Sequence, residues 1–285
     1  MKTPMLPEII DIPAPTRIGV MGMDNLDVNN LPYDDGEPLE TAWHRYAMNQ
    51  LCEVAIYYYR ARNDFYVGGN MFLYYNLERQ RHRDFRGPDF FFVWGVEPHR
   101  WRKYYAVWEE DYHYPNVILE LLSESTIQID RVEKRALYQN ILHTPEYFLC
   151  DFEVASLEGL RLNAQKVYEP IPANERGWIW SEQLQLWLGP WTGAYLERKA
   201  IWPRFYDPSG RLVPRFDEAA QQHAEEEKQR ADQKELLSEH EKQRADAARQ
   251  NAEQEKQRAD AAETEMARLR RELEEMRQRF PKAPE

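Results

Sequence analysis

Apolar residues recur with the period of an α-helix in two segments of the first 216 positions. The first segment covers 41–60, with apolar residues at Trp43, Met48, Leu51, Ala55 and Tyr58. The second covers 130–142, with apolar residues at Val132, Ala136, Leu137 and Ile141. This spacing is typical of a helix that packs one face against a core. The pattern therefore predicts two helices, each with its apolar face buried.

Short apolar runs around these helices predict β-strands. The runs at 89–94 (DFFFVW), 116–122 (NVILELL) and 146–151 (EYFLCD) are suited to strands buried on both faces. The segments 66–75 and 160–168 are expected to form further strands, the second of them at the outer side of the sheet. The resulting order of helices and strands predicts an α/β fold, in which a mixed central sheet is flanked by a few helices.

Two regions differ from this core. Residues 1–36 hold prolines at positions 4, 7, 13, 15 and 32, which exclude long helices and predict an extended arm. Residues 176–214 are rich in aromatic side chains and turn signals, which predicts a β-rich appendage to the same core. We therefore expect an arm at 1–36, a main domain at 37–213 and a charged helical tail at 214–285.

The tail carries an internal repeat. The hexapeptide EKQRAD occurs at 227–232, 241–246 and 255–260, a spacing of 14 residues or two heptads. The heptad core positions are mostly alanine or polar before Ala259 and carry methionine and leucine after it, at Met266, Leu269, Leu273 and Met276. This predicts a long helix with a coiled coil in its last three heptads, and through it a homodimer. A solitary charged helix is the alternative.

Net charge narrows the classes of function. The chain carries −12, of which the 69 residues after Phe216 contribute 14 Lys/Arg and 19 Asp/Glu, or −5. An acidic protein does not coat nucleic acid non-specifically, although a local basic groove remains compatible with this charge. Only two cysteines occur, and no run of about 18 apolar residues is present, so we expect neither a disulfide framework nor a membrane span. The cytoplasm is the expected compartment.

Two acidic residues lie in or beside otherwise apolar strands. Asp89 precedes the run FFFVW, and Glu120 is the one acid inside NVILELL. A buried carboxylate needs compensation, and a divalent cation held by both residues would provide it. Lys134 follows in the next helix and could stabilise charge on a phosphate or on an attacking water. Asp130 is a possible N-cap of that helix, and Ser123 lies in the connecting loop.

A basic segment flanks the first of these acids. It comprises Arg79, Arg81, Arg83, Arg86, Arg100, Arg102 and Lys103. Trp101, Tyr104 and Tyr105 are interleaved with it and could stack on bases or sugars. The segment predicts contacts with DNA. The alternative is a solvated loop whose positive charge balances the negative charge of Glu109, Glu110 and Asp111.

The chain resembles the PD-(D/E)XK nuclease superfamily and, within it, the bacterial family of restriction endonuclease-like proteins. The resemblance is carried by GPDFFFVW (87–94), PNVILELLSESTIQIDRVEKRALY (115–138) and TPEYFLCD (144–151), with DDGEPLETAWH (34–44) and RGWIWSEQLQLWLG (176–189) in support. The superfamily pattern places a lysine two residues after the second acid, where this chain has Leu122. In the branch of the superfamily that this chain resembles, the lysine lies on the following helix, and Lys134 matches that position.

The resemblance implies a restriction endonuclease-like fold and hydrolysis of DNA phosphodiester bonds. Asp89 and Glu120 would hold Mg²⁺ or Mn²⁺, and Lys134 would orient or activate the attacking water. In such sites an acid of the first helix often completes the metal site, and Glu40 and Glu53 are the candidates for this acid. His44 is four residues after Glu40 and could lie on the same face of the helix. The alternative is an inactive nuclease-like protein that recruits partners through its coiled coil.

Overall fold

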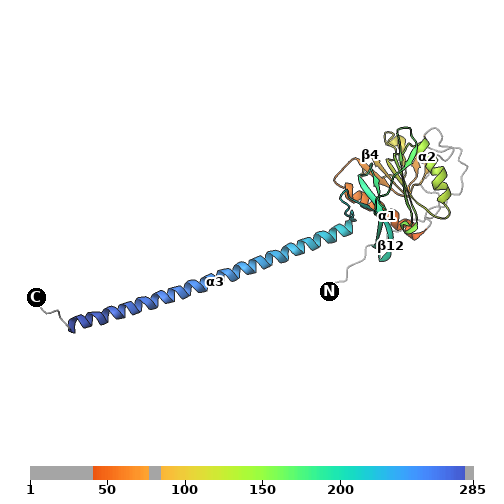
Figure 1. The fold of residues 1–285 in the computed structure, drawn as a ribbon. Helices are drawn as coiled ribbons and strands as arrows, with labels where there is room; N and C mark the ends of the chain where they lie inside the picture. The colour runs from red at the N-terminus through yellow and green to blue at the C-terminus, as the bar shows by residue number, and fades with distance from the viewer. Residues whose placement is uncertain (1–40, 77–84, 280–285) are drawn as a thin grey trace, which may run out of the picture. The chain divides into compact units, whose positions relative to one another are not determined.

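The computed structural model describes residues 41–76 and 85–279, and the chain divides after Phe216 into two units. The first unit contains a central β-sheet, two smaller sheets and the helices α1 (Ala42–Tyr59) and α2 (Arg135–Asn140) (Figure 1). The second is formed by the long helix α3 (Phe216–Arg279). The predicted α/β fold class with a long C-terminal helix is confirmed. The expected arm at 1–36 lies outside the described residues.

The central sheet has six strands in the order β1-β4-β6-β7-β8-β9. Its strands β6 and β7 run parallel and every other neighbouring pair is antiparallel, so the sheet is mixed as predicted. The bounds are β1 Phe65–Gly68, β4 Phe90–Trp94, β6 Val117–Leu121, β7 Glu146–Cys150, β8 Leu157–Leu162 and β9 Tyr168–Pro170.

Two of the predicted strands are interrupted. The segment 66–75 divides after Gly68, and its second part, β2 (Leu73–Tyr74), joins a small sheet with β3 (Phe85–Arg86) and β5 (Tyr105–Ala106). The segment 160–168 contains the turn between β8 and β9. The Oδ1 atom of Asn163 accepts hydrogen bonds from the amides of Gln165 and Val167, at 3.0 and 2.9 Å, and closes this turn. Polar turn chemistry thus replaces a continuous strand.

The two faces of the central sheet are covered by different elements. On one face Leu51 of α1 belongs to a cluster that includes Phe90 and Leu119, and the sheet of β10–β12 completes that cluster. On the other face Phe91 and Ile118 pack in a cluster that includes Tyr138 and Leu142. Successive residues of β4 and β6 therefore face opposite layers, as the pleat requires.

The aromatic region after residue 176 forms an antiparallel three-stranded sheet. Its strands are β10 (Ile179–Ser181), β11 (Leu186–Tyr195) and β12 (Arg198–Tyr206), in that spatial order. The ring of Trp202 stacks on Trp43 of α1 with centroids 6.2 Å apart, and both are buried. The sheet therefore shares the main hydrophobic core, as the sequence indicated. Two short 3₁₀ helices, η2 (Val107–Glu109) and η4 (Phe152–Val154), connect other elements.

The predicted helix at 41–60 is observed with nearly the expected bounds. Thr41 precedes it in an extended conformation, and its hydroxyl accepts a hydrogen bond from the amide of His44 at 3.3 Å. A threonine at the N-cap position commonly satisfies one of the unpaired amides of the first helical turn in this way. Among the helices of residues 41–76 and 85–279, none combines the length and the apolar content that a membrane span requires.

Candidate active site

The two predicted acids meet at one end of the central sheet. Strands β4 and β6 pair with Phe90 opposite Leu119, so the next pair toward the end of the sheet is Asp89 and Glu120. The amide of Leu121 donates to Asp89 Oδ2 at 2.8 Å, and the amide of Asp89 donates to Glu120 Oε2 at 3.4 Å. Each carboxylate thus binds the backbone of the other strand. Both belong to the side of the pleat that carries Phe91 and Ile118.

A helix with an irregular turn lies over this face of the sheet. It begins at 127, contains a π-helical segment, η3 (Ile129–Lys134), and continues as α2. The amide of Arg135 donates to the carbonyl of Asp130, five residues back, instead of the usual four. Such wide turns are often found at functional sites. Here the turn belongs to the part of the helix that carries Asp130 and Lys134.

The buried face of this helix is largely polar, and of the predicted apolar face only Leu137 packs against the core. Val132 and Ile141 are 53 % and 56 % exposed, and Ala136 is also exposed. The residues that face the sheet are instead Asp130, Lys134 and Tyr138, spaced four apart. Asp130 and Tyr138 are fully buried, and the Lys134 side chain is 16 % exposed. Glu120 compensates the burial of Lys134 and Tyr138, and Lys134 compensates that of Asp130, which a hydrophobic pattern cannot indicate.

Lys134 forms ion pairs with two carboxylates. Its Nζ atom lies 3.1 Å from Glu120 Oε2 and 2.7 Å from Asp130 Oδ1. The hydroxyl of Tyr138 donates to the other oxygen of Glu120 at 2.7 Å. The carboxylate of Glu120 therefore receives contacts on both oxygens, one from a cation and one from a neutral donor.

Burial and charge perturb the ionisation of this cluster. Burial raises the pKa of Glu120 to about 7; the neighbouring Lys134 opposes this rise, and Asp89 and Asp130 add to it. Burial alone would lower the pKa of Lys134, but the carboxylates of Glu120 and Asp130 outweigh it and hold that pKa above its ordinary value. Lys134 is consequently a cation at neutral pH, whereas Glu120 titrates near neutrality.

The donor atoms at this sheet edge suit a hard divalent cation. Asp89 and Glu120 offer carboxylate oxygens, and Mg²⁺ is commonly bound by one or two carboxylates while it keeps several waters. Zinc sites use sulfur or several imidazoles, and no group of three or more His, Cys, Asp or Glu is arranged for a metal within residues 41–76 and 85–279. The ammonium of Lys134 on Glu120 also shows that this carboxylate accepts a cation. The residues therefore fit Mg²⁺ or Mn²⁺.

The other predicted site residues have different positions. His44 is buried, and its Nε2 atom lies 3.1 Å from the carbonyl oxygen of Leu121, the residue whose amide binds Asp89. His44 therefore contacts the backbone of β6 next to Asp89 and Glu120. Ser123 Oγ accepts from the amide of Thr126 at 3.2 Å and acts within the loop before the helix.

Glu53 is not brought to this cluster. Its Oε1 atom accepts a hydrogen bond from the amide of Phe216 at 3.1 Å, at the start of α3. The expectation that it completes the metal site is therefore wrong, because its carboxylate already caps another helix. Glu40, the second acidic candidate, lies outside the described residues.

Arg100 and Arg102, two of the four basic residues that the structure describes in this segment, pair with carboxylates. Arg102 binds both carboxylate oxygens of Glu110 at 2.8 Å, and its side chain is only 1 % exposed. Arg100 pairs with Glu109 at 3.0 Å and with Glu110 at 3.3 Å. This pairing matches the alternative of a loop that balances Glu109 and Glu110, and contact of Arg100 and Arg102 with DNA stays a prediction.

The remaining basic and aromatic residues of this segment differ in exposure. Arg86 donates to the carbonyl of Phe85, and Lys103 lies exposed on the loop beside Arg102. Arg79, Arg81 and Arg83 lie outside the described residues. Trp101 is 98 % exposed, whereas Tyr105 is fully buried and donates to the carbonyl of His113. Of the predicted stacking residues, Tyr105 is therefore excluded and Trp101 is accessible.

A comparison with known families decides which family this chain is part of. The family model described as "Uma2: Putative restriction endonuclease" matches residues 29–191, more than half of the chain. The chain belongs to the Uma2 family. The match confirms the resemblance inferred from the sequence. The matched Uma2 region contains Asp89, Glu120, Asp130 and Lys134, and it ends before α3.

Comparison with other proteins adds little to this Uma2 assignment. No curated protein matches the chain. A crystal structure of a putative nuclease belonging to DUF820, from Anabaena variabilis, is similar at 12 % sequence identity with a TM-score of 0.38. The similarity covers 53 % of this chain and 81 % of that one. At this level the neighbour carries no part of the argument about the site.

Proposed function

We propose that the protein is a Mg²⁺-dependent endonuclease that hydrolyses phosphodiester bonds of DNA, and that it acts in the cytoplasm. One observation carries the proposal. The lysine position of the superfamily pattern is taken by Leu122, which is buried, yet Lys134 reaches Glu120 from another element. The chain thus assembles two acids and a lysine despite the change in spacing. Membership of the Uma2 family supports the same conclusion.

Asp89 and Glu120 would hold the cation through their carboxylates. When bound there, Mg²⁺ supplies electrostatic stabilisation of the charge that develops on the scissile phosphate. The backbone holds Asp89 in place, because its Oδ2 atom accepts from the Leu121 amide, and Tyr138 fixes Glu120 through Oε1. These contacts fix the orientation of both carboxylates at this edge of the sheet.

A cation held by Glu120 would compete with the Lys134 ammonium, which contacts this carboxylate at 3.1 Å, so Lys134 would move away from it. Asp130 Oδ1, at 2.7 Å, would keep the ammonium near the site after this move. From there the ammonium can donate a hydrogen bond to the attacking water or to a phosphate oxygen. Its raised pKa keeps it protonated at neutral pH, so Lys134 acts as a donor and not as a general base.

Cleavage of both strands of a duplex needs two active sites or two successive events. A two-fold dimer supplies two sites, and the C-terminal helix α3 is the element through which we expect this protein to form a homodimer. Arg100 and Arg102 already pair with Glu109 and Glu110. We therefore expect the affinity for DNA to depend more on the bound divalent cation than on these two arginines.

A cleavage assay tests the proposal. Supercoiled plasmid, linear duplex and single-stranded RNA are incubated with the wild type, Glu120→Ala and Lys134→Ala, in Mg²⁺, Mn²⁺ or EDTA. We expect metal-dependent nicking of DNA by the wild type alone. Cleavage that survives both substitutions would show that another site is responsible. Lack of cleavage with either metal would favour the inactive interaction protein, and cleavage of RNA only would contradict the DNA substrate.

A further inference from the structure

The last three heptads of α3 carry an apolar stripe. It consists of Met266 (56 % exposed), Leu269 (50 %), Leu273 (55 %) and Met276 (63 %), preceded by Ala259 and Ala262. Every residue from 220 to 276 is exposed in the single chain. In the heptad, written a to g, Ala259, Met266 and Leu273 are the a positions and Ala262, Leu269 and Met276 are the d positions. Large side chains at consecutive a and d positions are characteristic of a helix that packs against another helix.

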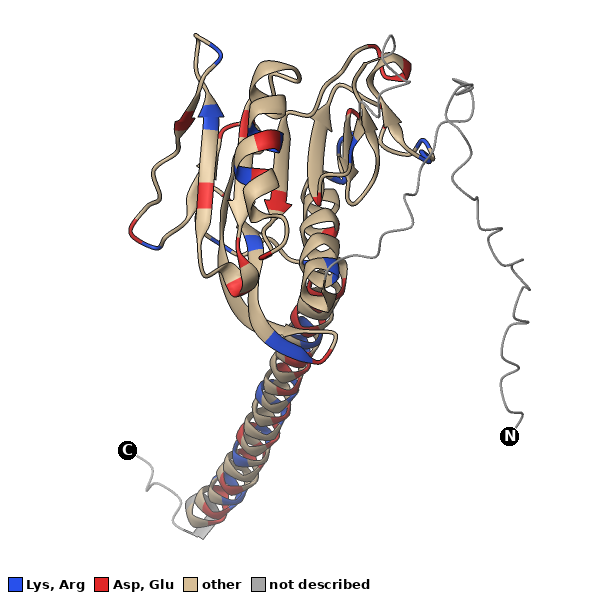
Figure 2. Ribbon diagram, turned by 90° about the vertical axis from the view of Figure 1, so that its right-hand side faces the viewer, with Lys and Arg blue, Asp and Glu red and all other residues tan. Residues whose placement is uncertain are grey.

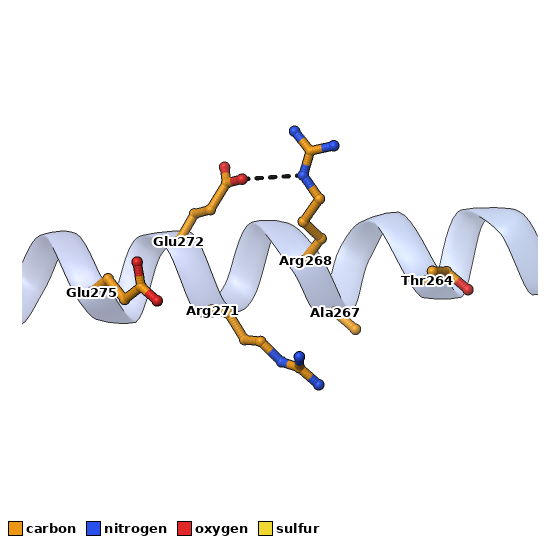
Figure 3. Close-up of a pocket in the computed structure, with 6 residues that line it drawn as sticks. All are labelled: Thr264, Ala267, Arg268, Arg271, Glu272 and Glu275. Carbon is orange, nitrogen blue, oxygen red and sulfur yellow. Dashed lines mark hydrogen bonds and ion pairs between the residues drawn. The ribbon is translucent and has the colours of Figure 1, made fainter.

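The opposite side of this segment is mostly polar, and some of its side chains pair with other groups of the same helix. Figure 3 shows Thr264, Ala267, Arg268, Arg271, Glu272 and Glu275, which line a concave surface formed by α3 alone. Arg268 pairs with Glu272 at 3.1 Å, and Thr264 donates to the carbonyl of Asp260 at 2.8 Å. Charges of both signs are interspersed along the helix (Figure 2). The stripe is therefore confined to one side.

We propose that the same segment of a second copy of this chain covers the stripe, with the two helices parallel and in register. The inference deepens the homodimer of the proposed function and does not depend on nuclease chemistry. In register, Met266, Leu269 and Leu273 each meet their own counterpart, so three successive layers are apolar. Small alanine layers precede them at Ala259 and Ala262 and allow close approach of the helices.

Charge on the flanks of the stripe selects the parallel arrangement. In a parallel pair, a g residue lies beside the e residue of the next heptad on the other helix. Arg258 of one copy then meets Glu263 of the second copy, and Glu265 meets Arg270. Each contact occurs twice by symmetry, and all of them join opposite charges.

The antiparallel arrangement brings like charges together. With Met266 layered against Leu269, g residues lie beside g residues and e beside e, so Glu265 of each copy meets Glu272 of the other, while Glu263 meets Arg270. The like-charge contacts cancel the favourable ones there, whereas the parallel pair has no like-charge contact from Arg258 onward. Upstream, the parallel pair itself becomes unfavourable, because Arg244 (g) would meet Arg249 (e), and Glu255 occupies a d position. The coiled coil is therefore expected from about residue 258 onward.

Cysteine cross-linking of the full-length protein tests orientation and register. Ala262→Cys puts a thiol at a d position, where two parallel, in-register chains bring the Cα atoms within disulfide range, below about 7 Å. Thr264→Cys, at an outward f position two residues away, is the matched control. The wild type, with Cys150 buried and Cys52 partly buried, is the blank. On oxidation we expect a reducible dimer band for Ala262→Cys and none for the other two.

Sedimentation equilibrium of the full-length chain supplies the second test. We expect a dimer for the wild type, a rise of roughly tenfold in the dissociation constant for Glu265→Arg, and recovery in the double variant Glu265→Arg, Arg270→Glu. A monomer at all concentrations would overturn the proposal, as would a dimer in which Ala262→Cys does not cross-link. Neither measurement uses DNA or metal, so loss of cleavage with an intact dimer would refute the nuclease alone.

Discussion

The ammonium of Lys134 lies 3.1 Å from the carboxylate of Glu120, although the two residues belong to different elements. Glu120 is in β6, and Lys134 ends the π-helical segment η3. Their contact joins the sheet to the helix above it through a buried ion pair. It also brings a cation to the carboxylate on which the proposed metal site depends.

Removal of the lysine should affect both activity and stability. In Lys134→Met, Glu120 and Asp130 lose their cation within the buried cluster, so the free energy of unfolding at pH 8 should fall by roughly 3 kcal/mol. Urea denaturation measures this loss, and DNA cleavage should be abolished. Lys199→Met, a change of an exposed lysine on β12, is the matched control and should alter neither quantity. Equal stability of both variants would contradict the buried pair.

Stability should depend on pH through Glu120. Its pKa is raised from 4.5 to about 7, so the folded protein retains a proton that the unfolded chain releases near pH 4.5. The free energy of unfolding of the wild type should therefore fall, relative to Glu120→Gln, as the pH rises from about 4.5 to 7, and level off above. Urea titrations of both proteins at pH 5, 6, 7 and 8 measure this difference. Parallel curves would show that Glu120 has an ordinary pKa.

Asp130 should act as a positioning residue for Lys134. In Asp130→Asn the ammonium loses its nearest carboxylate, at 2.7 Å, and depends more on Glu120, so a bound cation must compete with a tighter pair. Mg²⁺ affinity, measured by calorimetry without DNA, should weaken by about tenfold, a usual effect of changing a group that supports a metal ligand. Glu133→Gln, an exposed acid on the same helix, should leave the affinity unchanged. Equal affinities of both variants would remove Asp130 from this role.

Arg102 should contribute to folding and not to DNA affinity. Its bidentate pair with Glu110 is buried, so Arg102→Met should lower the free energy of unfolding by roughly 3 kcal/mol. Arg100→Met, at a side chain 42 % exposed, should cost less than about 1 kcal/mol. Fluorescence anisotropy with a labelled duplex should give similar affinities for both folded variants and the wild type. A large loss of DNA affinity for Arg102→Met would instead support its predicted role as a phosphate contact.

Much of the fold follows from apolar runs in the sequence. The strands β4, β6 and β7 are short, continuous apolar segments whose burial on both faces needs no other information. The alternation of side chains along β4 and β6 likewise leads from the sequence to a common face for Asp89 and Glu120. The family resemblance then identifies Lys134 as the third member.

The rest depends on tertiary contacts that periodicity cannot reveal. The helix over the site buries Asp130 and Tyr138 because Lys134 and Glu120 satisfy them, so its apolar residues Val132 and Ile141 remain outside. The spacing of four between Asp130, Lys134 and Tyr138 was the one available signal. The pair of Arg102 with Glu110 could not be predicted either, because the two residues are eight positions apart and only the folded loop brings their charges together.

Single-turnover cleavage of supercoiled plasmid shows whether Glu120 is required for metal-dependent hydrolysis of DNA. The wild type, Glu120→Gln and Glu124→Gln are compared in Mg²⁺ and in EDTA, since Glu124 is an exposed acid just beyond the site. The proposed metal site predicts Mg²⁺-dependent nicking by the wild type and Glu124→Gln, and a rate at least about a hundredfold lower for Glu120→Gln, because one carboxylate that would hold the cation is lost. Equal rates for Glu120→Gln and the wild type would contradict it.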